Sequence, residues 1–279
     1  MIHTVGIDMG STYTKAVIVD DSGAIVGRAM EPTGFRLAEV AAAVCERAAS
    51  EAGIRPADLA YAVATGYGRH QAPHADVRVT DLTSAARGAA SLFPGTRTIL
   101  DVGGQTMKAT RLGGAGKVDS FRLNDKCAAG TGAFLEKTAR YMGYSIEEIG
   151  PLVATSKEAA PISGVCAVFA ESEVINHLSN GVAPADIMYG AVVSLVGRSV
   201  QLMKRVNMEP EFTLIGGIMR FETMARVVRE AVRAEVNVPP PDMVQYVSAL
   251  GAALLGQRRL ARLAMERAAQ VPGVGAAGA

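Results

Sequence analysis

The chain has 279 residues, with 28 Lys and Arg against 27 Asp and Glu, so its formal net charge is +1. This balance excludes a basic field that could hold nucleic acid or anionic lipid, and we expect neither as a partner. No apolar run reaches the length of a membrane span, and the first residues lack the pattern of a signal peptide. We therefore expect a cytoplasmic protein.

The predicted elements follow one order in both halves of the chain. In the first half we expect strands at 4–8, 15–20, 25–29 and 61–65 and helices at 37–52 and 84–93. In the second half we expect strands at 98–102, 107–112, 118–123 and 212–215. Its helices are expected at 132–142, 167–178, 184–206, 221–234 and 245–264. The repeated order predicts an α/β fold with an internal duplication.

Each half opens on a strand that ends in aspartate and runs into a glycine turn. These turns are residues 8–12 (DMGST) and 101–106 (DVGGQT). Glycine lets backbone N–H groups come close to a phosphate, and the aspartate can hold Mg²⁺ through water or orient an attacking water. Lys15 and Lys108 follow at similar offsets. A lone turn of this kind is usually only a turn, but two of them in this order indicate phosphate binding.

A third glycine turn, Gly216 and Gly217, follows the apolar strand predicted at 212–215. A flat group such as adenine could lie against its backbone. The chain contains neither the Walker-type phosphate loop nor the Gly-x-Gly-x-x-Gly pattern of a dinucleotide-binding strand and helix.

Two of the three cysteines, Cys127 and Cys166, each precede a predicted helix. The positive end of the helix dipole favours the thiolate, which is the form that binds metal. Two ligands cannot complete a four-cysteine iron–sulfur site in one chain, whereas two chains could supply four. The alternatives are two buried thiols or a disulfide within the chain. Cys45 lies within a predicted helix and is interpreted as a small buried hydrophobic residue.

The glycine turns resemble the two phosphate motifs and the adenosine motif of the superfamily of sugar kinases, heat-shock ATPases and actin. The segments 6–12, 124–132, 166–174 and 246–253 make the resemblance more specific. Together they resemble the BadF/BadG/BcrA/BcrD-type ATPases, which comprise activators of 2-hydroxyacyl-CoA dehydratases and ATPase subunits of ATP-dependent benzoyl-CoA reductase. The resemblance runs from about residue 5 to residue 260.

The resemblance implies an actin-like ATPase fold of two duplicated βα subdomains with a nucleotide cleft between them. Residues 1–94 plus 246–264 would form subdomain I, residues 95–245 would form subdomain II with both cysteines, and 265–279 would be a flexible tail. It implies ATP or ADP with Mg²⁺, and a [4Fe–4S] cluster shared by two subunits. The implied partners are a second, homologous or identical ATPase subunit, an acyl-CoA reductase or dehydratase component, and a ferredoxin-type electron donor.

The resemblance also assigns residues to roles. The catalytic residues it implies are Asp8, Asp101 and Gln105. The nucleotide-binding residues it implies are Gly10, Ser11, Thr12, Lys15, Gly103, Gly104, Gly216 and Gly217. The metal ligands it implies are Cys127 and Cys166.

The chain departs from the family pattern in two places. Thr106 stands where many relatives have an aspartate after Gln105, and Met219, Arg220 and Phe221 stand where relatives often have a small residue and asparagine. A weakened hydrolytic site suits one member of a heteromeric ATPase pair, which favours a benzoyl-CoA reductase subunit. The alternative is a homodimeric activator of a 2-hydroxyacyl-CoA dehydratase.

Two other classes of protein share the fold. A small-molecule kinase would need a substrate pocket with a catalytic aspartate, and it gives no reason for two cysteines that precede helices. A non-catalytic, actin-like assembly protein would need ATP but no iron.

Overall fold

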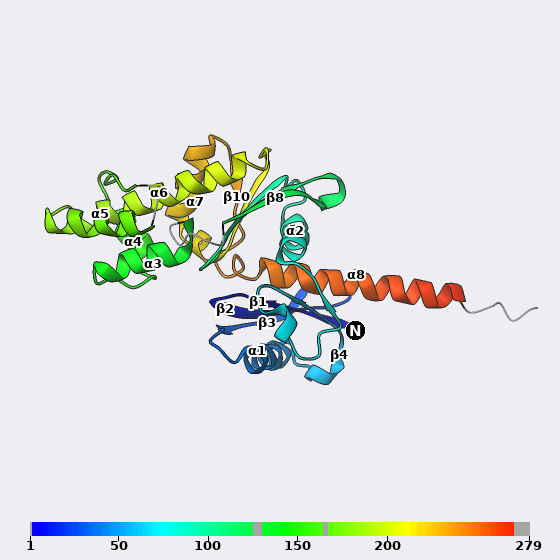
Figure 1. Cartoon of the computed structure of the whole chain (residues 1–279). Helices are drawn as coiled ribbons and strands as arrows, with labels where there is room; N and C mark the ends of the chain where they lie inside the picture. Colours follow the sequence, from blue (N-terminus) through cyan, green and yellow to red (C-terminus); the bar gives the residue numbers. More distant parts are fainter. Residues whose placement is uncertain (1, 125–129, 164–166, 271–279) are drawn as a thin grey trace, which may run out of the picture. The chain divides into compact units, whose positions relative to one another are not determined.

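The structure, a computed structural model, describes residues 2–124, 130–163 and 167–270 (Figure 1). The chain divides into two compact units. Unit 1 comprises residues 1–84 and 248–279, and unit 2 comprises residues 85–247. The first boundary therefore falls within a helix, and the second falls at the start of the last helix.

Unit 1 is a five-stranded sheet with helices on its two faces. Its elements are β1 (His3–Met9), β2 (Tyr13–Val19), β3 (Ile25–Pro32), α1 (Leu37–Glu51), η1 (Pro56–Asp58), β4 (Leu59–Thr65), η2 (Arg69–Gln71), β5 (Val77–Arg78) and, from its second residue, α8 (Val247–Gln270).

The side chains of β1 alternate between the two helices that cover the sheet. Val5, Ile7 and Met9 belong to the core that α1 covers. On the other face, the hydroxyl of Thr4 donates a hydrogen bond to the Ala253 carbonyl of α8 at 2.9 Å. Figure 1 accordingly shows α1 and α8 on opposite sides of this sheet.

Unit 2 has a second five-stranded sheet and most of the helices. Its elements are α2 (Asp81–Leu92, from Ala85 onward), β6 (Thr98–Val102), β7 (Met107–Leu112), η3 (Gly114–Gly116), β8 (Val118–Asn124), α3 (Gly132–Tyr141), α4 (Ile149–Ala154), α5 (Ala167–Ser179), α6 (Pro184–Lys204), β9 (Phe212–Ile215), η5 (Gly217–Arg220), α7 (Glu222–Val232) and β10 (Val236–Asn237).

Strand β6 also alternates between two cores. Leu100 and Val102 face the larger core, to which α3, α4, α6 and α7 contribute. Ile99 faces a smaller core that α2 builds from alanines. Both faces of β6 are therefore covered, and Asp101 lies next to the end of this strand, where the chain turns and its side chain is only partly buried.

The two sheets have the same topology. The strand order is β3-β2-β1-β4-β5 in unit 1, and read in the same direction it is β8-β7-β6-β9-β10 in unit 2. In each sheet the first three strands in chain order form antiparallel pairs, the first with the second and the second with the third. The fourth and fifth strands run parallel to the first strand of the chain order. The predicted α/β duplication is therefore confirmed at the level of strand pairing.

Several elements differ from those the sequence predicts. β5 and β10 have two residues each, which is too short to show alternation, and α4 contains Pro151, which reads as a helix breaker. The last helix runs to Gln270, six residues beyond the predicted end at Ala264. Its extension carries an i,i+4 ion pair between Arg262 and Glu266 at 2.7 Å.

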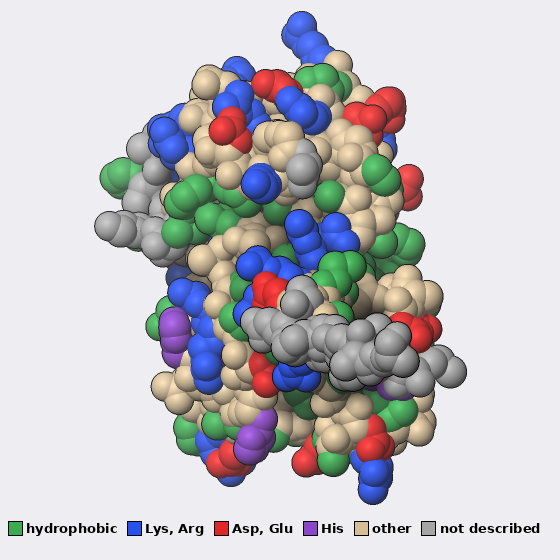
Figure 2. Space-filling view, turned by 90° about the vertical axis from the view of Figure 1, so that its right-hand side faces the viewer, with side chains coloured by type: hydrophobic (Ala, Val, Ile, Leu, Met, Phe, Trp, Pro, Cys, Tyr) green, Lys and Arg blue, Asp and Glu red, His purple; other side chains and the backbone are tan. Residues whose placement is uncertain are grey.

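The surface carries charges of both signs. Figure 2 shows Lys and Arg side chains interspersed with Asp and Glu side chains on one face. Within the described ranges, no helix is both long enough and apolar enough to cross a membrane.

Two glycines of α6 test the packing of unit 2. A methyl group on Gly190 would overlap the Ala160 carbonyl oxygen, whereas one on Gly197 would meet nothing within 4 Å. We expect Gly190→Ala to lower the free energy of unfolding by about 3 kcal/mol, because backbone must shift. Gly197→Ala should raise it by up to about 1 kcal/mol, because alanine is the better helix former. Urea unfolding followed by circular dichroism measures both, and equal effects would contradict this packing.

Candidate functional site

The first glycine turn, residues 8–12, joins β1 to β2. Asp8 pairs directly with Lys15 across the two strands, and the lysine Nζ lies 3.1 Å from the carboxylate Oδ2. Both side chains are about nine-tenths buried. The turn closes when the Gly10 N–H donates to the Tyr13 carbonyl at 3.1 Å. Ser11 and Thr12, at its tip, are exposed.

The second glycine turn, residues 101–106, repeats this geometry between β6 and β7. Asp101 pairs directly with Lys108, with 3.4 Å between Nζ and Oδ2. The Gly103 N–H donates to the Thr106 carbonyl at 2.8 Å. Each turn thus places a carboxylate neutralised by lysine beside a short run of backbone amides, an arrangement suited to an anion or to a cation held with it.

A glycine packs against each aspartate from the neighbouring parallel strand. Gly216 follows β9 with a φ of +100°, and a Cβ there would lie 2.9 Å from Asp101 Oδ1. Gly66 follows β4 with a φ of +86°, and a Cβ there would lie 2.6 Å from Asp8 Oδ1. The sequence singles out Gly216 but assigns no site role to Gly66. The two glycines occupy matching positions. Gly66 follows the β4 residue that pairs with Asp8, and Gly216 follows the β9 residue that pairs with Asp101.

The first turn of α3 holds the second glycine turn from behind. The Gly132 N–H donates to the Gly103 carbonyl at 2.9 Å, and the Ala133 N–H donates to the Gly104 carbonyl at 2.9 Å. In a trans peptide the C=O and the N–H of one unit point in opposite directions. Capture of these two carbonyls therefore aims the N–H groups of Gly104 and Gln105 away from α3, where they can receive an anion.

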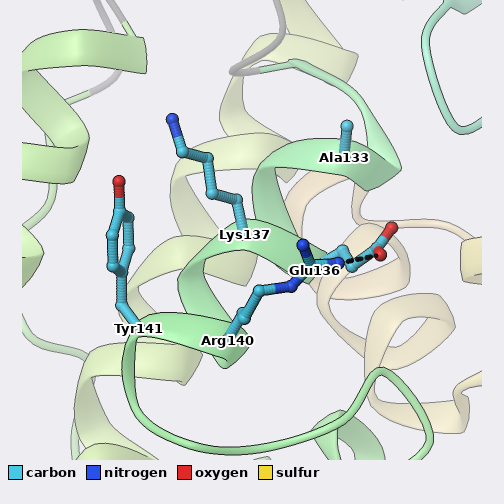
Figure 3. Close-up of a pocket in the computed structure, with 5 residues that line it drawn as sticks. All are labelled: Ala133, Glu136, Lys137, Arg140 and Tyr141. Carbon is cyan, nitrogen blue, oxygen red and sulfur yellow. Dashed lines mark hydrogen bonds and ion pairs between the residues drawn. The ribbon is translucent and has the colours of Figure 1, made fainter.

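The outer face of α3 lines an open pocket of about 350 Å³ (Figure 3). Five side chains line it, spaced along one helix face: Ala133, Glu136, Lys137, Arg140 and Tyr141. The Arg140 guanidinium donates to Glu136 at 2.8 Å. The sequence analysis does not single out these residues. Their i, i+3 and i+4 spacing in the helix predicted at 132–142 indicates that they share one helix face.

One charge pair links α3 to α5. Lys137 Nζ donates to Glu171 Oε2 at 2.8 Å, and this hydrogen bond raises the pKa of Lys137. The Tyr141 hydroxyl approaches the same oxygen at 3.4 Å. This pair joins the helix that follows Cys127 in the chain to the helix that follows Cys166.

The predicted metal ligands Cys127 and Cys166 lie outside the described residues. Helix α3 begins at Gly132 and α5 begins at Ala167, so each helix starts shortly after its cysteine in the chain. In the part of the chain that the structure describes, no three His, Cys, Asp or Glu side chains gather as a metal site.

The structure brings the predicted nucleotide-binding residues together in two groups. In unit 1 these are Asp8, Gly10, Ser11, Thr12 and Lys15, all on the first glycine turn or beside it. In unit 2 these are Asp101, Gly103, Gly104, Gln105, Gly216 and Gly217, where the strand ends of β6 and β9 meet. Gln105 is exposed, as Ser11 and Thr12 are.

Comparisons with known proteins cover nearly the whole chain. The family model for the BadF/BadG/BcrA/BcrD ATPase family matches residues 5–256. The chain is 40% identical over 253 residues to the activator of lactoyl-CoA dehydratase from Anaerotignum propionicum, covering 91% of this chain and 96% of that protein. It is 34% identical over 285 residues to one of the benzoyl-CoA reductase subunits from Thauera aromatica, covering 97% of this chain and 99% of that protein.

A solved structure also matches. It is the activator of the 2-hydroxyisocaproyl-CoA dehydratase from Clostridium difficile with bound ADPNP. The TM-score is 0.88 at 35% identity, covering 99% of this chain and 100% of that one.

Cys45 provides a chemical test of the cysteine assignments. It packs against the unit 1 core, and burial raises the pKa of its thiol from 9.0 to about 12. A raised thiol pKa means that its contribution to stability is present below about pH 9 and is lost as the pH rises toward 12. We expect iodoacetamide at pH 8 to leave Cys45 unmodified in folded protein and to alkylate it in urea, as peptide mass spectrometry would show. Equal modification in both conditions would contradict this burial.

Proposed function

The chain belongs to the BadF/BadG/BcrA/BcrD ATPase family and has its actin-like ATPase fold, and from this we propose that it is the ATP-dependent activator of a 2-hydroxyacyl-CoA dehydratase. The observation that carries the proposal is the pair of hydrogen bonds from the first turn of α3 to the Gly103 and Gly104 carbonyls. These bonds connect a phosphate-binding turn to the helix that follows Cys127.

In this proposal both glycine turns bind the phosphates of ATP. Backbone amides of the turns and the Lys15 ammonium contact phosphate oxygens, and Ser11 and Thr12 donate from the exposed tip. Asp8 and Asp101 would hold Mg²⁺ through water, and Gln105 would orient the water that attacks the γ-phosphate. The adenosine would lie against the backbone of Gly216 and Gly217. Thr106 supplies no carboxylate, so we expect slow hydrolysis.

ATP and ADP would then differ in their contacts with the second glycine turn. A ligand shifts a conformational equilibrium only through such differential contacts. A rotation of the Gly103 or Gly104 peptide would change the hydrogen bonds to Gly132 and Ala133, and α3 would move with it. The ion pair between Lys137 and Glu171 would carry part of that movement to α5.

The proposed redox centre is a [4Fe–4S] cluster held by Cys127 and Cys166 of two chains. The fit rests on the chemistry of the donors, because four thiolates are the common ligand set of such clusters. The bound cluster would supply one-electron redox chemistry. Around it, the chain's own contribution would be the two helices that follow the cysteines in the chain, α3 and α5. Because α5 begins at the residue after Cys166, the positive end of its dipole would favour the Cys166 thiolate.

The proposed partners follow from the fact that one chain supplies only two of the four cysteine ligands. A second copy of the chain would complete the cluster, a ferredoxin-type protein would supply the electron, and the dehydratase component would accept it. What supports a protein contact beside Cys166 is the first turn of α5, where Val168 is 65% exposed and Phe169 is 63% exposed.

On the basis of Thr106, the sequence favours the ATPase subunit of a benzoyl-CoA reductase. The comparisons instead support the activator of a 2-hydroxyacyl-CoA dehydratase. The lactoyl-CoA dehydratase activator shares 40% identity with this chain, and the reductase subunit shares 34%. The ATPase subunit of a benzoyl-CoA reductase is therefore kept as the second candidate.

Anaerobic purification followed by iron analysis tests the proposal. We expect about two iron atoms per chain, which is four per dimer. Cys127→Ala and Cys166→Ala should each abolish iron binding while the Kd for ATP stays within twofold, because the cysteines lie apart in sequence from the glycine turns. Cys45→Ala is the matched control and should keep both iron and ATP. Iron-free protein after anaerobic reconstitution would contradict the cluster, and loss of iron in Cys45→Ala would contradict the ligand assignment.

Hydrogen exchange tests the connection between the nucleotide and α3. We expect the amides at the start of α3 to exchange at different rates with ADP and with a non-hydrolysable ATP analogue, because their acceptors are the Gly103 and Gly104 carbonyls. Helix α7, which makes none of these bonds, serves as the internal control. Identical exchange of α3 in both nucleotide states, with both nucleotides bound, would rule out this connection.

A further inference from the structure

The segment that follows β3 returns to the first glycine turn. Its first residue, Thr33, is 2% exposed and lies beside the turn at the edge of the sheet. Nothing in the sequence patterns singles out this threonine, because it belongs to neither a glycine turn nor a cysteine segment.

Thr33 makes three hydrogen bonds there. Its N–H donates to the Thr12 carbonyl at 2.9 Å, and its hydroxyl donates to the Gly10 carbonyl at 2.8 Å. The hydroxyls of Thr33 and Thr14 lie 2.9 Å apart. Because the single hydroxyl proton of Thr33 goes to Gly10, the Thr14 hydroxyl is the donor in that contact.

These bonds determine where the amides of the turn point. The Gly10 carbonyl shares its peptide unit with the Ser11 N–H, and the Thr12 carbonyl shares its unit with the Tyr13 N–H. In each trans unit the N–H points away from the captured oxygen. With both carbonyls held by Thr33, the N–H groups of Ser11 and Tyr13 point away from Thr33.

We propose that Thr33 is a positioning residue of the nucleotide site, which orients the first glycine turn to receive phosphate. The proposal rests on the proposed function, because it needs the turn to bind a nucleotide. Thr33 itself touches no phosphate and acts through the peptide units that it holds. Phosphates common to ATP and ADP contact an already oriented turn, so both nucleotides benefit.

In unit 2 the carbonyls of the glycine turn are held by different hydrogen-bond donors. There the Gly103 and Gly104 carbonyls accept from backbone amides of Gly132 and Ala133, at the start of α3. Backbone amides cannot be removed by ordinary substitution. The hydroxyl of Thr33 can be, so unit 1 is where this device can be tested.

The test compares nucleotide binding in Thr33→Val and Thr33→Ser. Valine keeps the branched shape but cannot hold the Gly10 carbonyl, and a hydrogen bond of ordinary strength corresponds to an increase in Kd of about 3- to 10-fold. We expect this increase for both ATP and ADP by isothermal titration calorimetry, with KM for ATP raised in parallel and kcat little changed. Thr33→Ser keeps the hydroxyl and should bind within twofold of the unchanged protein.

Thr4→Val is the matched control. Thr4 is 1% exposed, and its hydroxyl bonds to the Ala253 carbonyl at the opposite end of β1. If Thr33→Val and Thr4→Val both lower the melting temperature and neither changes the Kd, the role of Thr33 is structural only and the proposal is wrong. Should Thr33→Val not fold, Thr33→Ala takes its place under the same criterion.

The outcome separates this proposal from the proposed function. If the unchanged protein does not bind ATP, the proposed function fails before Thr33 is tested. If the unchanged protein binds ATP and Thr33→Val binds it equally well, only the positioning role fails.

Discussion

The structure depends on the capture of backbone carbonyls behind its two glycine turns. A short turn rich in small residues has few side chains to fix its own peptide planes. In unit 1 the carbonyls of Gly10 and Thr12 are held by Thr33, and in unit 2 those of Gly103 and Gly104 are held by α3. Because each peptide unit is rigid, holding its oxygen also fixes the direction of its N–H. Because the amides of the turn already point in the direction that an anion needs, binding of the anion costs less conformational entropy.

The two ways of holding the turns have different mechanical properties. One residue on a loop, Thr33, holds the first turn through its hydroxyl and its N–H, and a change there need not displace a helix. The two amides that hold the second turn belong to the start of a helix, so a change in their acceptors would move Gly132 and the rest of α3 together. The cysteines follow this division, since Cys127 and Cys166 precede helices of unit 2 in the chain, whereas Cys45 lies partly buried within a helix of unit 1.

Sequence reasoning recovers what is local and repeated. The strand Met107–Leu112 is predicted with its observed bounds, and Lys15 and Lys108 are recognised as following the two aspartates at similar offsets. Their pairing with Asp8 and Asp101 comes from the structure. The reasoning fails where the signal is short or distant. The two-residue strands β5 and β10 are too short to show an alternation of apolar and polar residues. Helix α4 contains a proline, which in the sequence argues against a helix.

The contacts behind the turns could not be predicted from the sequence for a different reason. The contact from Gly132 to Gly103, like that from Thr33 to Gly10, joins residues more than twenty positions apart. The donor of the first is a backbone amide, which every residue except proline carries, and the donor of the second is the hydroxyl of one threonine among many. Only the folded chain brings these residues together.

The two sheets share one topology, and the units differ in what holds the glycine turn after the third strand, which is Thr33 in unit 1 and α3 in unit 2. Under the proposed function, unit 1 would hold the nucleotide in place, and only unit 2 would pass a change of nucleotide on to the helices that follow Cys127 and Cys166 in the chain. The direction of signal flow would then come from this one difference between two otherwise similar halves.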